Sequence, residues 1–302
     1  MSNTSIHPAS NRAAIENTIN WWPSPAKINL FLHVCAQLEN GYHELQTLFQ
    51  LLDYCDEIGT QVNLSGEIAL ADNIEGVKFE DNLIVKAAMK LLPYRSNSDY
   101  GVRLFMRKRI PMGGGLGGGS SNAATVLVVL NYLWKCKLSS QQLQNIALDL
   151  GADVPVFVNG MSAFAEGVGE TLIPAHIPEQ FYLVATPNVH ISTAAVFGHP
   201  DLPRNTPKVD FSEYQFDKTQ NDCEKLVSNT HPEVANLLQW LVHYAPSRMT
   251  GTGASVFAQF SSKEDAENVL KQLPTGVSAF VAKGIDSSPL HSVLAQADAK
   301  LC

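Results

Sequence analysis

PMGGGLGGGSS, residues 111–121, places six glycines within seven positions directly before an apolar run that is typical of a buried helix. Glycine loses more conformational freedom on folding than any other residue, so a dense cluster is costly in ordered structure. Such a cluster indicates backbone that bends sharply or lies bare against a ligand. VRLFMR, residues 102–107, alternates in the manner of a strand, so the glycines are predicted to join a strand to a helix.

A glycine-rich helix start is suited to binding an anion. The first backbone N–H groups of a helix lack partners within the helix, the helix dipole favours negative charge there, and glycine lets phosphate oxygens approach. Ser120, Ser121 and Asn122 add short polar side chains suited to capping or to phosphate and metal contact. The alternative is a flexible turn, but isolated glycines suffice for a turn. We therefore predict a phosphate-binding loop.

Familiar phosphate loops do not account for the stretch. Gly113, Gly115 and Gly118 match G-x-G-x-x-G, but a run this rich in glycine matches by abundance alone. The acidic residue expected about twenty residues later, after a second strand, is missing, because residues 129–134 continue the helical pattern. The chain contains no Gly-Lys-Ser/Thr, which excludes a P-loop, and no H-R-D or D-F-G of protein kinases.

Composition narrows the class of protein. The chain has 302 residues, of which 45 % are hydrophobic, enough for one large domain or two ordinary ones. Its formal net charge of −8 argues against nucleic acid or an anionic membrane as the main partner. Residues 1–20 are polar and are predicted to form a loose N-terminal tail without a signal peptide. The apolar run 123–130 is too short to cross a bilayer.

The five cysteines, Cys35, Cys55, Cys136, Cys223 and Cys302, are odd in number and form no C-x-x-C pair. This pattern indicates reduced thiols and a cytoplasmic protein rather than a disulfide framework or zinc ribbon. His43-Glu44 begins like a zinc-binding helix, but Thr47 stands where the second histidine would fall. We expect no structural metal.

Two segments near the N-terminus predict a hairpin. From Ala26 to Val34 apolar residues alternate with others, which indicates a strand with Lys27 and Asn29 on one face. Asn40-Gly41 is the favoured dipeptide for a tight turn because both residues tolerate positive φ. Tyr42 and His43 then leave the turn at the mouth of the sheet.

Helices are predicted at two further places. Residues 82–92 have helical spacing of apolar positions. A second helix is predicted over roughly 140–150, with Ser139 and Gln142 spaced as a capping box and Gly151 as its stop.

Later segments change in character. Pro155 in GADVPVF is predicted to restrict Val154 and break the chain direction. Beyond about residue 165, FYLVATP reads as a strand, a long polar connection with prolines follows, and MTGTGASVFAQF, residues 249–260, again joins glycines to a strand before a helix in EDAENVLKQL. We predict a domain boundary near residue 165.

PMGGGLG, residues 111–117, and TGTGAS, residues 250–255, resemble the two glycine loops of the GHMP kinases. Gly118 and Gly119 lengthen the first loop. Together with PSPAKINLFL, NGYHELQTLFQ, EDNLIV, GADVPVF, FAEGVGE and SPLH, that extension resembles one branch of the family, over about residues 21–292. The resemblance implies an α+β, two-domain GHMP-kinase-like fold with the active site in the interdomain cleft. It divides the chain into an ATP-binding, catalytic domain (21–165) and a substrate-binding domain (166–302), and the tail 1–20 has no counterpart.

The resemblance implies phosphoryl transfer from ATP to an alcohol, with Asp153 as general base and Lys27 as the cation that orients it. Taken alone, Asp153 before a proline would be a turn residue and Lys27 a solvated charge. The positions that match the family's ATP site are Asn82, Lys108, Pro111, Met112, Gly113, Gly114, Gly115, Leu116, Gly117, Gly118, Gly119, Ser120, Ser121 and Asn122. ATP is expected to bring Mg²⁺ with it, and no protein ligand for the metal is predicted.

The implied substrate of this branch is cytidine diphosphate methylerythritol, phosphorylated on its 2-hydroxyl for isoprenoid synthesis. The expected contacts are Tyr42 and Phe197 on the faces of the cytosine ring, His43 on its edge, Asn29 and Thr193 on the polyol or diphosphate, and Gly251 and Gly253 in the second loop. Without the resemblance, Tyr42 and Phe197 would equally be packing aromatics and Lys108 an edge-strand charge. Leu38 and Asn40 depart from the Arg and Asp common in the family.

Two alternative functions stay open from the sequence. Another family kinase, acting on homoserine or mevalonate, is disfavoured by Tyr42-His43 and by the longer glycine loop. A catalytically silent nucleotide sensor is disfavoured by the intact Lys27 and Asp153. The protein is expected to be a monomer or a homodimer, with no nucleic-acid or membrane partner.

Overall fold

The computed structural model describes residues 18–71 and 77–299. Of the predicted N-terminal tail, residues 1–17 lie outside the described residues, as does Cys302. The strands are β1 (Asn20–Gln37), β2 (His43–Asn63), β3 (Ile68–Leu70), β4 (Gly101–Arg107), β5 (Ala163–Glu166), β6 (Thr171–Pro174), β7 (Phe181–Pro187), β8 (Ser247–Met249), β9 (Val256–Phe260) and β10 (Val277–Ile285).

The helices alternate with these strands along the chain. They are α2 (Leu83–Leu91), α3 (Gly118–Leu133), α4 (Ser140–Leu148), α5 (Val154–Asn159), α6 (Thr193–Gly198), α7 (Asp222–Thr230), α8 (Pro232–Leu241), α9 (Lys263–Leu270) and α10 (Pro289–Ala299). With a mixed sheet, the chain has the predicted α+β fold. No helix in the described ranges is long and apolar enough to cross a membrane.

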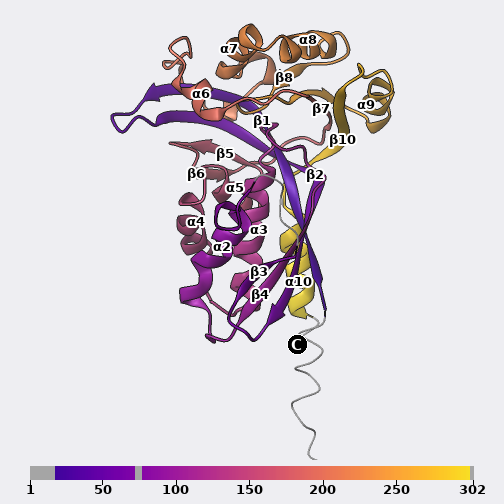
Figure 1. Ribbon diagram of the computed structural model, residues 1–302. Helices are drawn as coiled ribbons and strands as arrows, with labels where there is room; N and C mark the ends of the chain where they lie inside the picture. Colours follow the sequence, from indigo (N-terminus) through magenta and orange to yellow (C-terminus); the bar gives the residue numbers. More distant parts are fainter. Residues whose placement is uncertain (1–17, 72–76, 300–302) are drawn as a thin grey trace, which may run out of the picture.

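The sheet runs through the whole molecule along the path β3-β4-β2-β10-β7-β9-β8, with β1 and β5 paired to β2 and β6 paired to β5. Its pairings are antiparallel except for β3 with β4. The long β1–β2 hairpin connects the lower half of Figure 1, where α3 and α10 lie beside it, to the upper half, where α6, α7 and α8 lie. A residue on this hairpin can therefore face elements from both halves.

Three apolar clusters fill the interior. The first packs α2, α3, α5 and α10 against the β1–β2–β4 end of the sheet, and the second packs α7, α8 and α9 against β7 and β9. The third lies between them and includes Phe31, Leu48 and Phe257. Leu32 and Val34 of β1 belong to the second cluster, and Leu290 of α10 belongs to the first. Each half of the chain thus contributes to the core of the other. The domain boundary near residue 165 stays a prediction.

The predicted hairpin forms, but its turn differs from the prediction. The connection spans residues 38–42, closed by Leu38 N donating to Tyr42 O at 2.8 Å. Gly41 has a positive φ of 85°, whereas Asn40 does not; its side chain instead accepts a hydrogen bond from Tyr42 N at 3.0 Å. A two-residue turn was the wrong prediction because Asn40 holds the longer loop through its side chain.

The helices predicted over 82–92 and roughly 140–150 are confirmed within two residues at each end, and the helix predicted in EDAENVLKQL forms but ends at Leu270, three residues before that stretch does. Helix α4 begins with the predicted capping box: Ser139 Oγ accepts from Gln142 N, and Gln142 Oε1 accepts from Ser139 N. It ends at Leu148 with Asp149 as C-cap, ahead of Gly151. Residues 121–130 of α3 are all buried, as the apolar run indicated.

The segment GADVPVF separates two helices as predicted, since α4 ends at Leu148 and α5 begins at Val154, but the predicted restriction of Val154 by Pro155 is wrong. Val154 is the first residue of α5, and Pro155 follows it in the first turn. A proline is tolerated there because the first-turn N–H groups have no partner within the helix. The helix places Asp153 at its N-cap with a side chain that makes no capping bond.

We expect the core beneath α2 to be sensitive at Leu91 and tolerant at Met89. Leu91 is fully buried, whereas Met89 on the same helix is 45 % exposed. Leu91→Ala should lower the free energy of unfolding in urea by about 2–5 kcal/mol, because it removes apolar contacts and leaves a cavity. Met89→Ala should change it by less than about 0.5 kcal/mol, and equal losses in the two variants would contradict this packing.

Candidate active site

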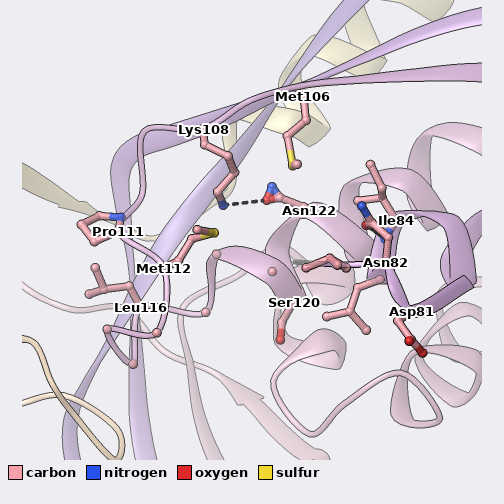
Figure 2. A pocket seen from close by; sticks show the side chains of 18 residues that line it. Asp81, Asn82, Ile84, Met106, Lys108, Pro111, Met112, Leu116, Ser120 and Asn122 are labelled. Atoms are coloured by element: carbon pink, nitrogen blue, oxygen red, sulfur yellow. Dashed lines mark hydrogen bonds between the residues drawn. The ribbon is translucent and has the colours of Figure 1, made fainter. Parts of the chain in front are cut away.

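A cavity of about 460 Å³ opens beside the first glycine loop. Figure 2 shows side chains from three segments facing it: Asn82 from the start of α2, Lys108 after β4, and Asn122 in α3. The predicted ATP-site residues that line it are Asn82, Lys108, Pro111, Met112, Gly113, Gly114, Gly115, Leu116, Gly117, Gly118, Gly119, Ser120 and Asn122. Of that predicted set, only Ser121 does not line the cavity.

Ser121 points into the protein. It is fully buried, and its Oγ lies 2.9 Å from Ser24 Oγ on β1. Asn82, in contrast, lines the cavity. Its Oδ1 caps α2 by accepting from Ile84 N at 3.1 Å, while its buried Nδ2 has no hydrogen-bond partner among the described residues. A buried donor without a partner is costly, so Nδ2 is available to an acceptor on a ligand in this cavity.

The glycines are required by positive φ and by close approach. Gly113, Gly115 and Gly117 have φ between 69° and 74°, which L side chains rarely adopt. A Cβ on Gly115 would lie 2.5 Å from the carbonyl oxygen of Thr250, in the second glycine loop. Gly117 is the N-cap of α3 without a side chain to cap it. The helix therefore presents its first N–H groups bare, as an anion site needs.

The ammonium of Lys27 lies at the centre of a second group of residues. Lys27 is 2 % exposed, and Nζ donates to Asn29 Oδ1 at 2.6 Å and to Gly115 O at 3.1 Å. The third polar neighbour of Nζ is Asp153 Oδ2 at 3.2 Å. Because an ammonium carries three N–H groups, these three oxygens satisfy it fully. Lys27 thus joins β1 to the glycine loop and to the turn before α5.

Asn29 is itself fixed by two threonines. Its Nδ2 donates to Thr47 Oγ1 at 2.9 Å, and its backbone N donates to Thr250 Oγ1 at 2.9 Å. Lys27 and Asn29 lie between register shifts of β1 against β2, one before Lys27 and one after Asn29. Such bulges re-aim side chains next to active sites.

A cavity of about 280 Å³ lies on the other side of Lys27 and shares Gly115 and Ser120 with the first. The predicted residues that line it are Lys27, Asn29, Asp153, Thr193, Phe197 and Gly251. Gly253 lies behind it, where a Cβ would meet Met249 Sδ at 3.0 Å. The predicted catalytic pair lines this second cavity, and Lys27 Nζ reaches the first through its bond to the carbonyl oxygen of Gly115, which lines both.

The three residues predicted at the cytosine ring lie near the tip of the β1–β2 hairpin. His43 is 9 % exposed, its ring centroid is 5.3 Å from that of Phe197, and Nε2 accepts from Arg204 Nε at 3.1 Å. Burial first, and then the charge of Arg204, lower the pKa of His43. Tyr42 is 64 % exposed and, like His43, does not line the second cavity. Their contact with a base stays a prediction.

Sequence reasoning missed three polar residues that hold these groups in place. Thr47 and Thr250 fix Asn29, and Asp56 on β2 makes an ion pair with Lys108. Thr250 stands in TGTGAS, a motif whose resemblance to the family rests on its glycines. Asp56 lies in the strand sequence LLDYCDEI, where nothing in the local pattern distinguishes a buried carboxylate from an exposed one.

Family models match the chain in both halves. The GHMP kinases N terminal domain matches residues 82–161, and the GHMP kinases C terminal matches residues 209–278. A Pseudoalteromonas atlantica protein named 4-diphosphocytidyl-2-C-methyl-D-erythritol kinase is 58 % identical, over 93 % of this chain and 98 % of that protein. The chain belongs to the GHMP kinases. A second relative of this GHMP kinase, of the same name from Shewanella frigidimarina, is 54 % identical over 95 % and 98 % of the two chains.

Solved structures agree with the membership. The crystal structure of a 4-(cytidine 5'-diphospho)-2C-methyl-D-erythritol kinase superposes on this GHMP kinase with a TM-score of 0.77 at 30 % identity, covering 88 % of this chain and 99 % of that one. Methanococcus jannaschii mevalonate kinase superposes with a TM-score of 0.61 at 14 % identity, over 89 % and 99 % of the chains, which shows a common fold.

The described residues of this GHMP kinase contain no group of three or more His, Cys, Asp or Glu placed to hold a metal ion. The glycine loop also has no carboxylate. The described thiols Cys35, Cys55, Cys136 and Cys223 are unpaired, and burial raises the pKa of the Cys55 thiol to about 12, so it is not activated.

We expect the two ends of the glycine loop to differ in their tolerance of a methyl group. Gly115→Ala should lower the free energy of unfolding by about 2 kcal/mol or more, because φ is positive and the Cβ would meet a backbone carbonyl. Gly119→Ala is the matched control: it lies in α3, and its Cβ would only touch Leu83 Cδ1 at 3.5 Å. Thermal unfolding without nucleotide measures both, and a stable Gly115→Ala protein would contradict the interlocked loops.

Proposed function

We propose that this GHMP kinase transfers the γ-phosphoryl group of ATP to the 2-hydroxyl of 4-diphosphocytidyl-2-C-methyl-D-erythritol, giving the 2-phosphate and ADP in the non-mevalonate isoprenoid route. Relatives that are 53–58 % identical over nearly the whole chain carry the name of that kinase. The observation that carries the proposal is the contact between Lys27 and Asp153 in the second cavity, next to Gly115, which lines both cavities. A donor on one side and an alcohol on the other would meet there.

The chemistry follows from the positions of these two side chains. Asp153 accepts the proton of the 2-hydroxyl. The oxygen of that hydroxyl forms a bond to the γ-phosphorus, and the bond from the γ-phosphorus to the β–γ bridging oxygen breaks. Lys27 pairs with the carboxylate and places positive charge beside the developing alkoxide. Lys27 Nζ also donates to Gly115 O, so the side chain that orients the general base is bonded directly to the loop that holds the phosphates.

The ATP is proposed to occupy the larger cavity. Its phosphates lie along the glycine loop at the start of α3, and its base lies toward Asn82 and Lys108. Mg²⁺ enters as part of the nucleotide complex and neutralises phosphate charge. The protein supplies the backbone N–H groups and the Ser120 hydroxyl, which lines both cavities.

The cytidylyl group is proposed to bind near the hairpin tip. His43 Nε2 accepts a hydrogen bond from Arg204, so the proton of the neutral ring is on Nδ1, free to be donated to an acceptor on the edge of cytosine. Phe197 packs on the His43 ring and holds its orientation, and Tyr42 is exposed for stacking. Thr193, bonded to Thr252 at 3.0 Å, lies on the path to Asp153.

We propose that the protein is cytoplasmic and is a monomer or a homodimer.

Two alternative functions would have different experimental consequences. A kinase for mevalonate or homoserine would keep the Lys27–Asp153 pair but would not depend on His43. A nucleotide sensor would bind ATP without needing the pair at all.

The purified protein should consume ATP with cytidine diphosphate methylerythritol and not with mevalonate, homoserine or galactose. Asp153→Asn should lower kcat by about 10²–10⁴-fold, because it removes the general base, while ATP still binds. Coupled detection of ADP measures turnover, and calorimetric titration measures nucleotide binding.

Asp149→Asn is the matched control, because Asp149 also pairs with a lysine, Lys90 at 2.6 Å, but on the surface. Its kcat should match that of the wild type. Near-normal kcat in Asp153→Asn would remove Asp153 from the mechanism. Turnover of another alcohol would overturn the assigned substrate, and tight ATP binding without any turnover would favour the sensor.

Binding of the cytidylyl substrate should weaken in acid through His43. The pKa of His43 lies below its ordinary value of 6.5, so the ring stays neutral from pH 8 to 6.5 and KM for this substrate should be flat there. Below the lowered pKa, a proton on Nε2 would face the Arg204 guanidinium, and KM should rise about tenfold per pH unit. His43→Gln should abolish this rise, whereas a rise already present between pH 8 and 7 would exclude His43 as its cause.

A further inference from the structure

Asp56 on β2 is a fully buried carboxylate beside the nucleotide cavity. Its Oδ1 accepts hydrogen bonds from the backbone N–H groups of Arg109 at 2.7 Å and Ile110 at 2.9 Å. Its Oδ2 accepts from Asn122 Nδ2 at 3.0 Å and forms an ion pair with Lys108 Nζ. Four donors therefore surround the carboxylate. They offset the cost of burying its charge and hold it in one orientation.

Two of these donors, Lys108 and Asn122, line the nucleotide cavity. Because Asn122 gives its Nδ2 to Asp56, its Oδ1 is turned to Lys108 Nζ, 3.4 Å away, and Figure 2 shows the two side chains reaching toward each other. Lys108 thus uses one N–H on Asp56 and one on Asn122. The third N–H is left for an acceptor on the ligand.

The position of Lys108 has an electrostatic cost that Asp56 offsets. A Cβ on Gly118 would lie 3.2 Å from Lys108 Nζ, so the ammonium sits against the first residue of α3. The helix dipole disfavours a cation at that end of a helix. Without Asp56, the flexible lysine side chain, already 26 % exposed, would gain both entropy and hydration by turning outward.

We propose that Asp56 is a positioning residue for ATP binding, acting through Lys108 and Asn122. Asp56 does not touch the nucleotide and takes no part in the proton transfer at Asp153. The inference rests on the proposed nucleotide site, but not on the identity of the alcohol substrate.

The full chain with Asp56→Asn tests the proposal by titration with ATP and Mg²⁺ in the absence of the second substrate. The amide has one acceptor oxygen where the carboxylate offered two, and its NH₂ group would face the Lys108 ammonium. We expect the Kd for ATP to rise about tenfold, the loss of one charge-assisted hydrogen bond, with KM for the cytidylyl substrate changed less than about twofold. In a Lys108→Met background, Asp56→Asn should change the Kd by less than about threefold, because the charged group it positions is gone and only the neutral Asn122 still depends on it.

Asp222→Asn is the matched control for a merely structural effect. Asp222 is 3 % exposed and accepts from Val34 N at 2.7 Å and Gln220 Nε2 at 2.6 Å, away from the nucleotide cavity. It should lower the melting temperature and leave the Kd for ATP unchanged. Asp56→Asn that binds ATP as the wild type does, or that loses the same factor with and without Lys108, would overturn the proposal.

Two further comparisons keep the test decisive. If Asp56→Asn does not fold, Lys108→Met is compared with the double variant, in which both charges are removed: equal Kd values support the proposal, and a tenfold weaker double variant overturns it. A wild-type protein that binds ATP but turns over no alcohol would refute the proposed function, and the Kd comparison would still decide the role of Asp56.

Discussion

The buried ammonium of Lys27 is the interaction on which the arrangement of the site depends. A lysine that is 2 % exposed is stable only if its N–H groups are all bonded, and they are, to Asn29, Gly115 and Asp153. These partners come from the first strand, the glycine loop and the turn before α5. Removing any one of them would leave a buried charge short of a partner, which costs several kcal/mol in buried pairs. Lys27 Nζ therefore fixes the positions of these three segments relative to one another.

The same region joins the two halves of the chain. Gly115 O accepts a hydrogen bond from Lys27 Nζ, and Gly114 O accepts one from Ser255 N at 3.2 Å. The first glycine loop is therefore bonded both to β1 and to the second glycine loop. Thr250 adds the bond to Asn29 N. Glycine is needed at 114 and 115 because a Cβ would lie within 2.5 Å of Ser255 Oγ or Thr250 O. Close packing, rather than flexibility, explains the density of glycines here.

Much of this arrangement could be predicted from the sequence. Period and capping signals predicted β4, α2 and α4 within two residues, because these depend on neighbours in the chain, and predicted the middle of β1, which begins six residues before Ala26. Family motifs identified site residues of which most line the two cavities, whereas Tyr42, His43, Ser121 and Gly253 line neither. Asp56, Thr47 and Thr250 were not predicted, since their importance comes from partners 18 to 221 residues away. The burial of Ser121 was also hidden, because helix phase decides which of two adjacent serines faces the ligand.

The two lysine–aspartate pairs at the cavities differ in how far each carboxylate is already engaged. Asp56 accepts four donors and is fully buried, so it has no lone pair to offer a substrate proton. Asp153 makes no capping bond, its side chain is 36 % exposed, and within the described chain its polar contact is Lys27. The local sequence shows neither pair, because each lysine lies at least 52 residues from its aspartate along the chain. The number of donors on each carboxylate supports the positioning role proposed for Asp56, and it leaves Asp153 able to accept a further hydrogen bond.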